Sequence, residues 1–475
     1  MKKTQILMLI VCLILPAITG IAAESTELTL KPGQWIGAIE IPGMGELAIV
    51  FNIEYDGKAY SATCDSPDQG VTGLPVESVT VTDKLVKLTV PSVMAWFEGE
   101  IQADGAVITG KWNQGGQALV CEVKLSDTPY SPKRPQHPEA PFPYQVKEVE
   151  FTNPDADIVL AGTLTIPEGE GPFPAVVLVA GSGPNDRDET VFGHKPFLVL
   201  SDYLTRHDII VLRYDKRGIG ESKGDYKTAT SADFASDAVA ALTFLRKQEK
   251  VNSEKVGLIG HSEGGLIAPM VAAEKPDRVN FIVMMAGPGV PGHELLPVQL
   301  ETILTLSGQT PEEINKSKEQ QDMVFTILRE EADLEKAAER LTELAKKLYA
   351  EMTEEEKAQE GATEEAVIQG ALASNTAWLR FFLMADPRNY LRKTQCPTLA
   401  IWGEKDVQVP PEQNRPEVEK ALAEAGNKNV VLKVFPGMNH LFQTAETGQV
   451  MEYGKIEETL SPDVLKEIAE WVKAR

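Results

Sequence analysis

A serine stands among glycines at residues 260–265, where the chain reads GHSEGG. The residues before it, KVGLI, are typical of a buried strand, and those after it, LIAPMVAAE, are typical of a helix. Ser262 therefore falls on the turn between a strand and a helix. A Gly-x-Ser-x-Gly pattern at such a turn is a nucleophile elbow, in which Gly260 and Gly264 leave room for a tight bend that lifts the hydroxyl. The pattern predicts a nucleophilic Ser262.

A serine hydroxyl needs a base beside it to act as a nucleophile at neutral pH. The chain has six histidines, and His440, in VFPGMNHLF, follows the last strand-like run. The acid that orients such a base is expected between serine and histidine in the chain, after the preceding strand. Glu404 and Asp406 follow the run PTLAIWG. We predict Asp406 for this role, with Glu404 as the alternative.

The negatively charged oxygen of a tetrahedral intermediate needs preorganised N–H donors. One candidate is the backbone N–H of Glu263, the residue after the serine. The other is the backbone N–H of Ser182, in the segment GSGP that follows the run PAVVLVA. This chemistry requires no cofactor, and no Cys-x-x-Cys or His-x-His cluster suggests a structural metal. We expect neither a cofactor nor a metal.

The elements that must position these residues begin near residue 146, where short apolar runs alternate with helical stretches. This alternation predicts an α/β domain over 146–475 with a mostly parallel sheet. Ser231 is expected to cap the helix that begins there. Between about 293 and 392 long, charged helical runs replace the alternation. We interpret them as a helical cap inserted over the sheet; a coiled-coil partner surface is the alternative.

A different pattern precedes this domain. Residues 24–127 alternate apolar and polar residues between Gly, Asp-Gly and Pro turns, which predicts a small all-β barrel or sandwich. Cys64 and Cys121 lie in such runs, where a disulfide and two buried thiols both fit. Six prolines between 129 and 143 predict a stiff linker over 128–145.

The N-terminus and the net charge indicate the localisation of the protein and the partners it can have. Residues 1–23 carry two lysines, an apolar run and small residues at Ala22 and Ala23, the layout of a signal peptide. An uncleaved membrane anchor is the alternative. We expect a periplasmic or secreted protein with no integral membrane segment after cleavage. The formal net charge of −24 argues against nucleic acid as a partner. The oligomeric state has no signal in the sequence.

Five motifs together resemble the serine α/β-hydrolases, and within them bacterial secreted or periplasmic esterases near the serine aminopeptidase-like hydrolases, which often carry a β-rich domain in front. The motifs are AGSGPNDRDE (180–189), LRYDKRGIGES (212–222), GHSEGGLIAP (260–269), AIWGEKDVQVP (400–410) and GMNHLF (437–442). The resemblance implies a carboxylesterase with Ser262, Asp406 and His440 as its catalytic triad. Asp215 and Arg217 look structural, whereas residues 186–188 either line the pocket or stabilise their own loop.

The expected reaction is hydrolysis of small or medium acyl esters through an acyl-enzyme, with a small-molecule ester as the partner. A serine peptidase would use the same triad but must bind a charged amine or an extended peptide chain. An aminopeptidase needs a carboxylate in the cap for the substrate's ammonium group. A thioesterase is also compatible. A non-catalytic binding protein that uses the β-rich domain is the alternative from another class.

Overall fold

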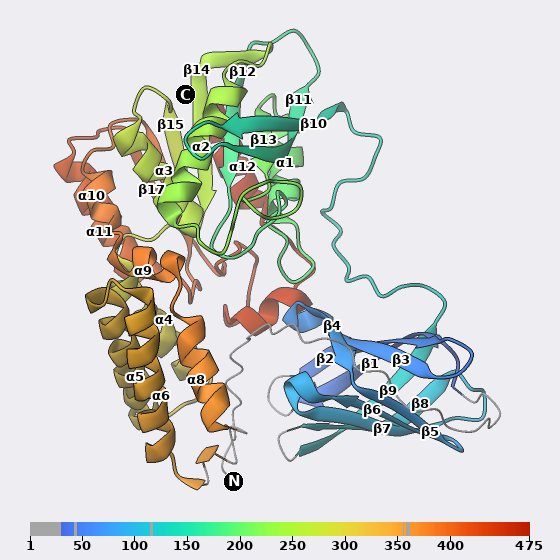
Figure 1. Cartoon of the computed structure of the whole chain (residues 1–475). Helices are drawn as coiled ribbons and strands as arrows, with labels where there is room; N and C mark the ends of the chain where they lie inside the picture. Colours follow the sequence, from blue (N-terminus) through green and yellow to red (C-terminus); the bar gives the residue numbers. More distant parts are fainter. Residues whose placement is uncertain (1–29, 42–44, 115–116, 355, 358–361) are drawn as a thin grey trace.

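The computed structural model describes residues 30–41, 45–114, 117–354, 356–357 and 362–475. Figure 1 shows three parts: a β domain, an α/β domain, and a bundle of helices that extends from the α/β domain. The predicted signal peptide, residues 1–23, lies outside the described residues and stays a prediction. No helix within the described ranges is long and apolar enough to cross a membrane.

The β domain is one antiparallel sheet with the strand order β4-β3-β2-β1-β9-β8-β7-β6-β5. β3 also packs near β5, and β4 near β6, so the sheet curls into a barrel-like unit. Alternate side chains, among them Trp35, Phe51 and Phe97, fill its interior. The strands are β1 (Gly33–Ile41), β2 (Gly45–Tyr55), β3 (Tyr60–Ser66), β4 (Val71–Val76), β5 (Ser78–Thr82), β6 (Leu85–Val90), β7 (Ala95–Ile101), β8 (Val107–Gln114) and β9 (Gln117–Ser126).

Cys64 and Cys121 are free, buried thiols in this core. Burial raises the pKa of each to about 12, so almost no reactive thiolate forms near pH 8. We expect both to resist iodoacetamide in the folded protein and to react fully in guanidinium without reductant, as read by peptide mass spectrometry. Resistance in guanidinium as well, relieved only by a reductant, would instead indicate the disulfide.

The α/β domain confirms the predicted fold class. Its eight-stranded sheet has the order β10-β11-β13-β12-β14-β15-β16-β17, and the strands from β12 onward pair in parallel. The short apolar runs of the sequence form these parallel strands. The strands are β10 (Tyr144–Asn153), β11 (Ile158–Pro167), β12 (Phe173–Val179), β13 (Ile210–Tyr214), β14 (Val251–His261), β15 (Phe281–Met285), β16 (Thr398–Gly403) and β17 (Val430–Phe435).

Helices cover both faces of this sheet. One face packs on α1 and α12, and the other on α2, α3, α10 and α11. The N-cap residue of α2 differs from the prediction: it is Thr230, in a capping box with Asp233, and not Ser231. The hydroxyl of Ser231 is therefore available to another partner. The helices are α1 (Pro196–Arg206), α2 (Ser231–Leu245), α3 (Glu263–Glu274), α10 (Pro387–Leu391), α11 (Pro411–Glu424) and α12 (Pro462–Lys473).

The remaining helices lie between β15 and β16, and we call them the cap. Apolar side chains such as Phe325, Leu341 and Leu383 join them into a small core of their own, while the charged faces point outward. Figure 1 shows the bundle standing apart from the β domain. The cap helices are α4 (Gly292–Leu306), α5 (Pro311–Glu330), α6 (Leu334–Glu351), α8 (Glu364–Ala373) and α9 (Ala377–Met384).

The β domain is held against the α/β domain near the segment that follows His440. Its short 3-10 helix η1 (Pro67–Gln69) packs on η3 (Val450–Lys455), so closely that a Cβ on Gly454 would lie 2.6 Å from the carbonyl oxygen of Asp68. Arg134, from the linker, donates to the carbonyl oxygens of Phe192 and Gly454 at 2.8 Å each. The linker is thus fixed to the surface of the α/β domain.

Candidate active site

Ser262 occupies the turn between β14 and α3, as the sequence predicts. Its φ of 54° and ψ of −115° are strained for a residue with a side chain. The flanking glycines permit this turn: a Cβ on Gly260 would lie 1.9 Å from the carbonyl oxygen of Gly264, and one on Gly264 would lie 2.0 Å from that of Val179. Within residues 261–270 only Ser262 is not buried. Ser262 is therefore the one partly exposed residue of this stretch, at the carboxyl edge of the sheet.

Asp406 and His440 lie together on the loops that follow β16 and β17. His440 Nδ1 donates to Asp406 Oδ2 at 2.8 Å. The other carboxylate oxygen accepts the N–H groups of Gln408 (2.9 Å) and Val409 (2.8 Å). Both side chains are buried. Because a carboxylate only accepts, this contact keeps the proton of a neutral His440 on Nδ1 and leaves Nε2 available as a base.

Glu404, the alternative acid, has another partner. Its carboxylate accepts the N–H of Gly437 at 2.8 Å, at the turn before His440. Glu404 thus contributes to the loop that carries the histidine, whereas Asp406 contacts the imidazole itself. The geometry favours Asp406.

A second buried histidine, His261, lies against His440. Its ring centroid is 4.8 Å from that of His440. Its Nδ1 faces Glu189 Oε1 and its Nε2 faces the backbone oxygen of His440, both at 3.0 Å. Burial opposes a charge on this ring, but the Glu189 carboxylate outweighs it and the pKa of His261 is raised. Two acceptors are both satisfied only by a doubly protonated ring.

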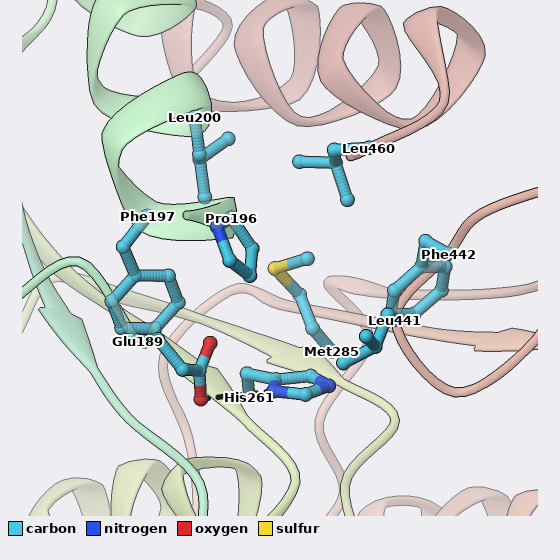
Figure 2. Close-up of a pocket in the computed structure, with 9 residues that line it drawn as sticks. All are labelled: Glu189, Pro196, Phe197, Leu200, His261, Met285, Leu441, Phe442 and Leu460. Atoms are coloured by element: carbon cyan, nitrogen blue, oxygen red, sulfur yellow. Dashed lines mark hydrogen bonds and ion pairs between the residues drawn. The ribbon is translucent and has the colours of Figure 1, made fainter. Parts of the chain in front are cut away.

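Figure 2 shows the surroundings of Glu189 and His261. The carboxylate of Glu189 meets the edge of His261, and apolar side chains close over them to form a small cavity. Every residue that lines it is buried, and neither Ser262 nor a cap residue is among them. The cavity is therefore separate from Ser262 and from the cap. The lining residues are Glu189, Pro196, Phe197, Leu200, His261, Met285, Leu441, Phe442 and Leu460.

The two predicted oxyanion donors flank Ser262. Gly181 precedes Ser182 at the end of β12, and a Cβ on Gly181 would lie 3.1 Å from Ser262 Cβ. Glu263 is the first residue of α3, where helix geometry leaves the N–H without an intrahelical partner. The positive end of the helix dipole adds to its attraction for an anion.

The side chain of Glu263 was not anticipated. It is 2% exposed and makes an ion pair with Lys216, whose Nζ lies 3.0 Å from Glu263 Oε2. Glu263 Oε1 accepts from Ser231 Oγ (2.6 Å) and from Trp378 Nε1 of α9 in the cap (2.7 Å). Glu263, the residue after Ser262, thus connects the loop after β13, α2 and the cap. The one feature of the sequence that could have indicated this role is a charged residue at the start of an otherwise apolar helix.

Several charged residues between 186 and 217 stabilise loops. Arg187 binds Asp215 (Nη2 to Oδ2, 2.7 Å), and although burial raises the pKa of this carboxyl, the guanidinium outweighs it and the pKa is lowered. Asp188 pairs with Arg213, and Arg217 binds Asp237 at 2.8 Å. Of the two roles left open for residues 186–188, these contacts favour loop stabilisation. Asp215 and Arg217 are structural, as expected.

No group of three or more His, Cys, Asp or Glu side chains in the described part of the chain is arranged to hold a metal ion.

Comparison with known proteins places the chain in a family. Residues 196–446, more than half of the chain, match the family described as serine aminopeptidase, S33. The chain belongs to this family. The S33 match begins at α1 and ends just beyond His440, so it includes Ser262, Asp406 and His440.

Two curated relatives are named as esterases. The chain is 30% identical over 389 residues to esterase EstD of Thermotoga maritima, covering 80% of this chain and 82% of that protein. It is 33% identical over 156 residues to esterase FrsA of Serratia proteamaculans, covering 33% of this chain and 34% of that protein. A solved structure, the Pyrococcus furiosus esterase Pf2001, is 17% identical with a TM-score of 0.42, covering 74% of this chain and 99% of that one.

Proposed function

We propose that the protein is a carboxylesterase that hydrolyses small or medium acyl esters with Ser262, His440 and Asp406. The observation that carries the proposal is the buried hydrogen bond from His440 Nδ1 to Asp406 Oδ2 at 2.8 Å. It prepares a histidine as a base at the edge of the sheet where the strained Ser262 stands. The similarity to EstD over most of both chains supports the ester as the substrate.

The steps follow from the roles of these groups. Ser262 Oγ attacks the carbonyl carbon of the ester while His440 Nε2 takes its proton. The negative oxygen of the tetrahedral intermediate receives hydrogen bonds from the N–H groups of Ser182 and Glu263. His440 then protonates the leaving alcohol, and the acyl group stays on Ser262. A water molecule, deprotonated by His440, attacks the acyl-enzyme and releases the acid.

An aminopeptidase is the second candidate, because the family carries that description. It would need a free carboxylate near Ser262 for the substrate's ammonium group. Glu263 is already paired with Lys216. Glu294, the first acid of the cap, is paired with Arg388 (Oε1 to Nη2, 2.8 Å). Both acids are thus already paired, which argues against either of them as the site for the ammonium group.

Substrate panels distinguish these candidates. We expect the protein without residues 1–23 to hydrolyse p-nitrophenyl esters in a series from acetate to decanoate and to leave aminoacyl-anilides intact. Ser262→Ala is the control that ties turnover to this site. Rapid anilide cleavage with weak ester turnover would contradict the proposal and favour the aminopeptidase. Faster turnover of acyl thioesters than of matched oxygen esters would identify a thioesterase.

A further inference from the structure

Both predicted oxyanion donors are connected to one buried cation, Lys216. The residue is the second after β13 and is 4% exposed. Its Nζ donates to the backbone oxygen of Gly181 at 2.5 Å and to Glu263 Oε2 at 3.0 Å. Gly181 is the second residue after β12, and Glu263 follows Ser262 as the first residue of α3. A single ammonium group thus joins the two segments.

The contact with Gly181 acts on the peptide unit that supplies a donor. The oxygen of Gly181 and the N–H of Ser182 belong to the same planar peptide group. A cation that binds this oxygen fixes the plane, and therefore the direction in which the N–H points. It also draws electron density toward the oxygen, which strengthens the N–H as a donor. Asn185 Nδ2 supports the same oxygen at 2.7 Å, but without a charge.

The contact with Glu263 acts on the other donor. Lys216, Ser231 and Trp378 hold the Glu263 carboxylate from three directions. A residue whose side chain is fixed in this way keeps its backbone N–H at the first position of α3 in place. Lys216 is itself held, because its Nζ lies 4.4 Å from the centre of the Phe234 ring.

We propose that Lys216 is a positioning residue of the oxyanion hole, which uses one charge to orient the N–H groups of Ser182 and Glu263 toward a common point. The inference rests on the proposed function, since it assumes an ester oxygen bound between those groups. Lys216 itself is not expected to touch the substrate. Its contribution is to the stability of the intermediate and not to the binding of the ester.

The first test is the kinetics of Lys216→Met, which keeps most of the side-chain length and removes the charge. Because misplaced donors weaken transition-state binding, we expect kcat to fall by about 10- to 100-fold with KM changed less than about threefold. A trifluoromethyl ketone, which forms a tetrahedral oxyanion adduct with a serine, should lose affinity by the same factor as kcat/KM. An unchanged affinity for this inhibitor would overturn the proposal.

Loss of the lysine also leaves the buried carboxylate of Glu263 unpaired, which destabilises a fold. Lys216→Met combined with Glu263→Gln removes that charge as well, and glutamine can still accept from Ser231 and Trp378. We expect this double variant to regain the Tm that the single variant loses while kcat stays low. Recovery of both would show that the lysine only stabilises the fold, and would overturn the proposal.

Two controls complete the experiment. Lys433→Met removes a lysine with similar contacts away from the site, since Lys433 pairs with Glu467 at 2.5 Å and lies 4.6 Å from the Phe435 ring centre; kcat should not change. Ser262→Ala tests the underlying mechanism. If Ser262→Ala is inactive and Lys216→Met is as fast as the wild type, the positioning role alone fails. If Ser262→Ala stays active, the proposed function fails first.

Discussion

Replacing Ser262 by alanine is expected to lower kcat for the best p-nitrophenyl ester by about 10⁶-fold, the loss seen when a triad nucleophile is removed. The loss is this large because the acyl-enzyme cannot form at all. The fold should survive, since alanine tolerates the strained backbone as well as serine does and no hydrogen bond of the Ser262 hydroxyl supports the turn among the contacts described. Steady-state kinetics and the Tm of the two proteins measure both expectations.

A matched control is Ser182→Ala. Ser182 is exposed and is proposed to contribute only its backbone N–H, so this variant should stay within about threefold of the wild-type kcat, well below the effect of losing an oxyanion donor. A fluorophosphonate probe should label the wild type and Ser182→Ala on Ser262, and leave Ser262→Ala unlabelled. Ester turnover by Ser262→Ala above the level of a mock purification would contradict the mechanism.

Replacing Asp406 by asparagine is expected to lower kcat by about 10⁴-fold near pH 7, the cost of losing the charge and the correct histidine tautomer in such a triad. The amide oxygen can still accept from Gln408 and Val409, which bind Asp406 Oδ1. The amide nitrogen would then donate to His440 Nδ1. The imidazole proton would move to Nε2, where the base must be free.

Glu404→Gln separates the two candidate acids. Its side chain can still accept the N–H of Gly437, as Glu404 does, so we expect kcat to stay within about threefold of the wild type, far from the triad effect. Kinetics of both variants, with Tm as the measure of folding, give the answer. A large loss in Glu404→Gln with an active Asp406→Asn would reverse the assignment and make Glu404 the acid.

Much of the fold was predictable from local patterns. The apolar runs that became β12–β17 are short and β-branched, because strands covered on both faces have no polar side to display. The period-two alternation before residue 127 predicted the β domain for the opposite reason: one face of each strand is buried and the other is exposed to solvent. The choice between barrel and sandwich was not predictable, because it depends on how far one sheet curls.

The candidate site also has residues that local patterns predict and one that they do not. Ser262 is marked by a steric need, since no side chain fits at Gly260 or Gly264, and such a need leaves a fixed pattern in the sequence. His440 and Asp406 follow from their positions after consecutive strands of a parallel sheet, whose carboxyl ends share one edge. The predicted N-cap of α2, Ser231, is one residue too late. Thr230 and Ser231 are both good N-cap residues, and only the contact of Ser231 with Glu263 in the folded protein distinguishes them.

The sequence by itself predicted the candidate nucleophile, the order of the three candidate catalytic residues and the two kinds of domain, because each depends on spacing along the chain. Only the tertiary structure decided which acid meets His440, that His261 lies between Glu189 and His440, and that Lys216 joins Gly181 to Glu263. These contacts link residues 34 to 179 positions apart. No local pattern predicts them. Lys216, which precedes Arg217, is indistinguishable in the sequence from a surface lysine, and its role depends on the sheet that places β12, β13 and β14 side by side.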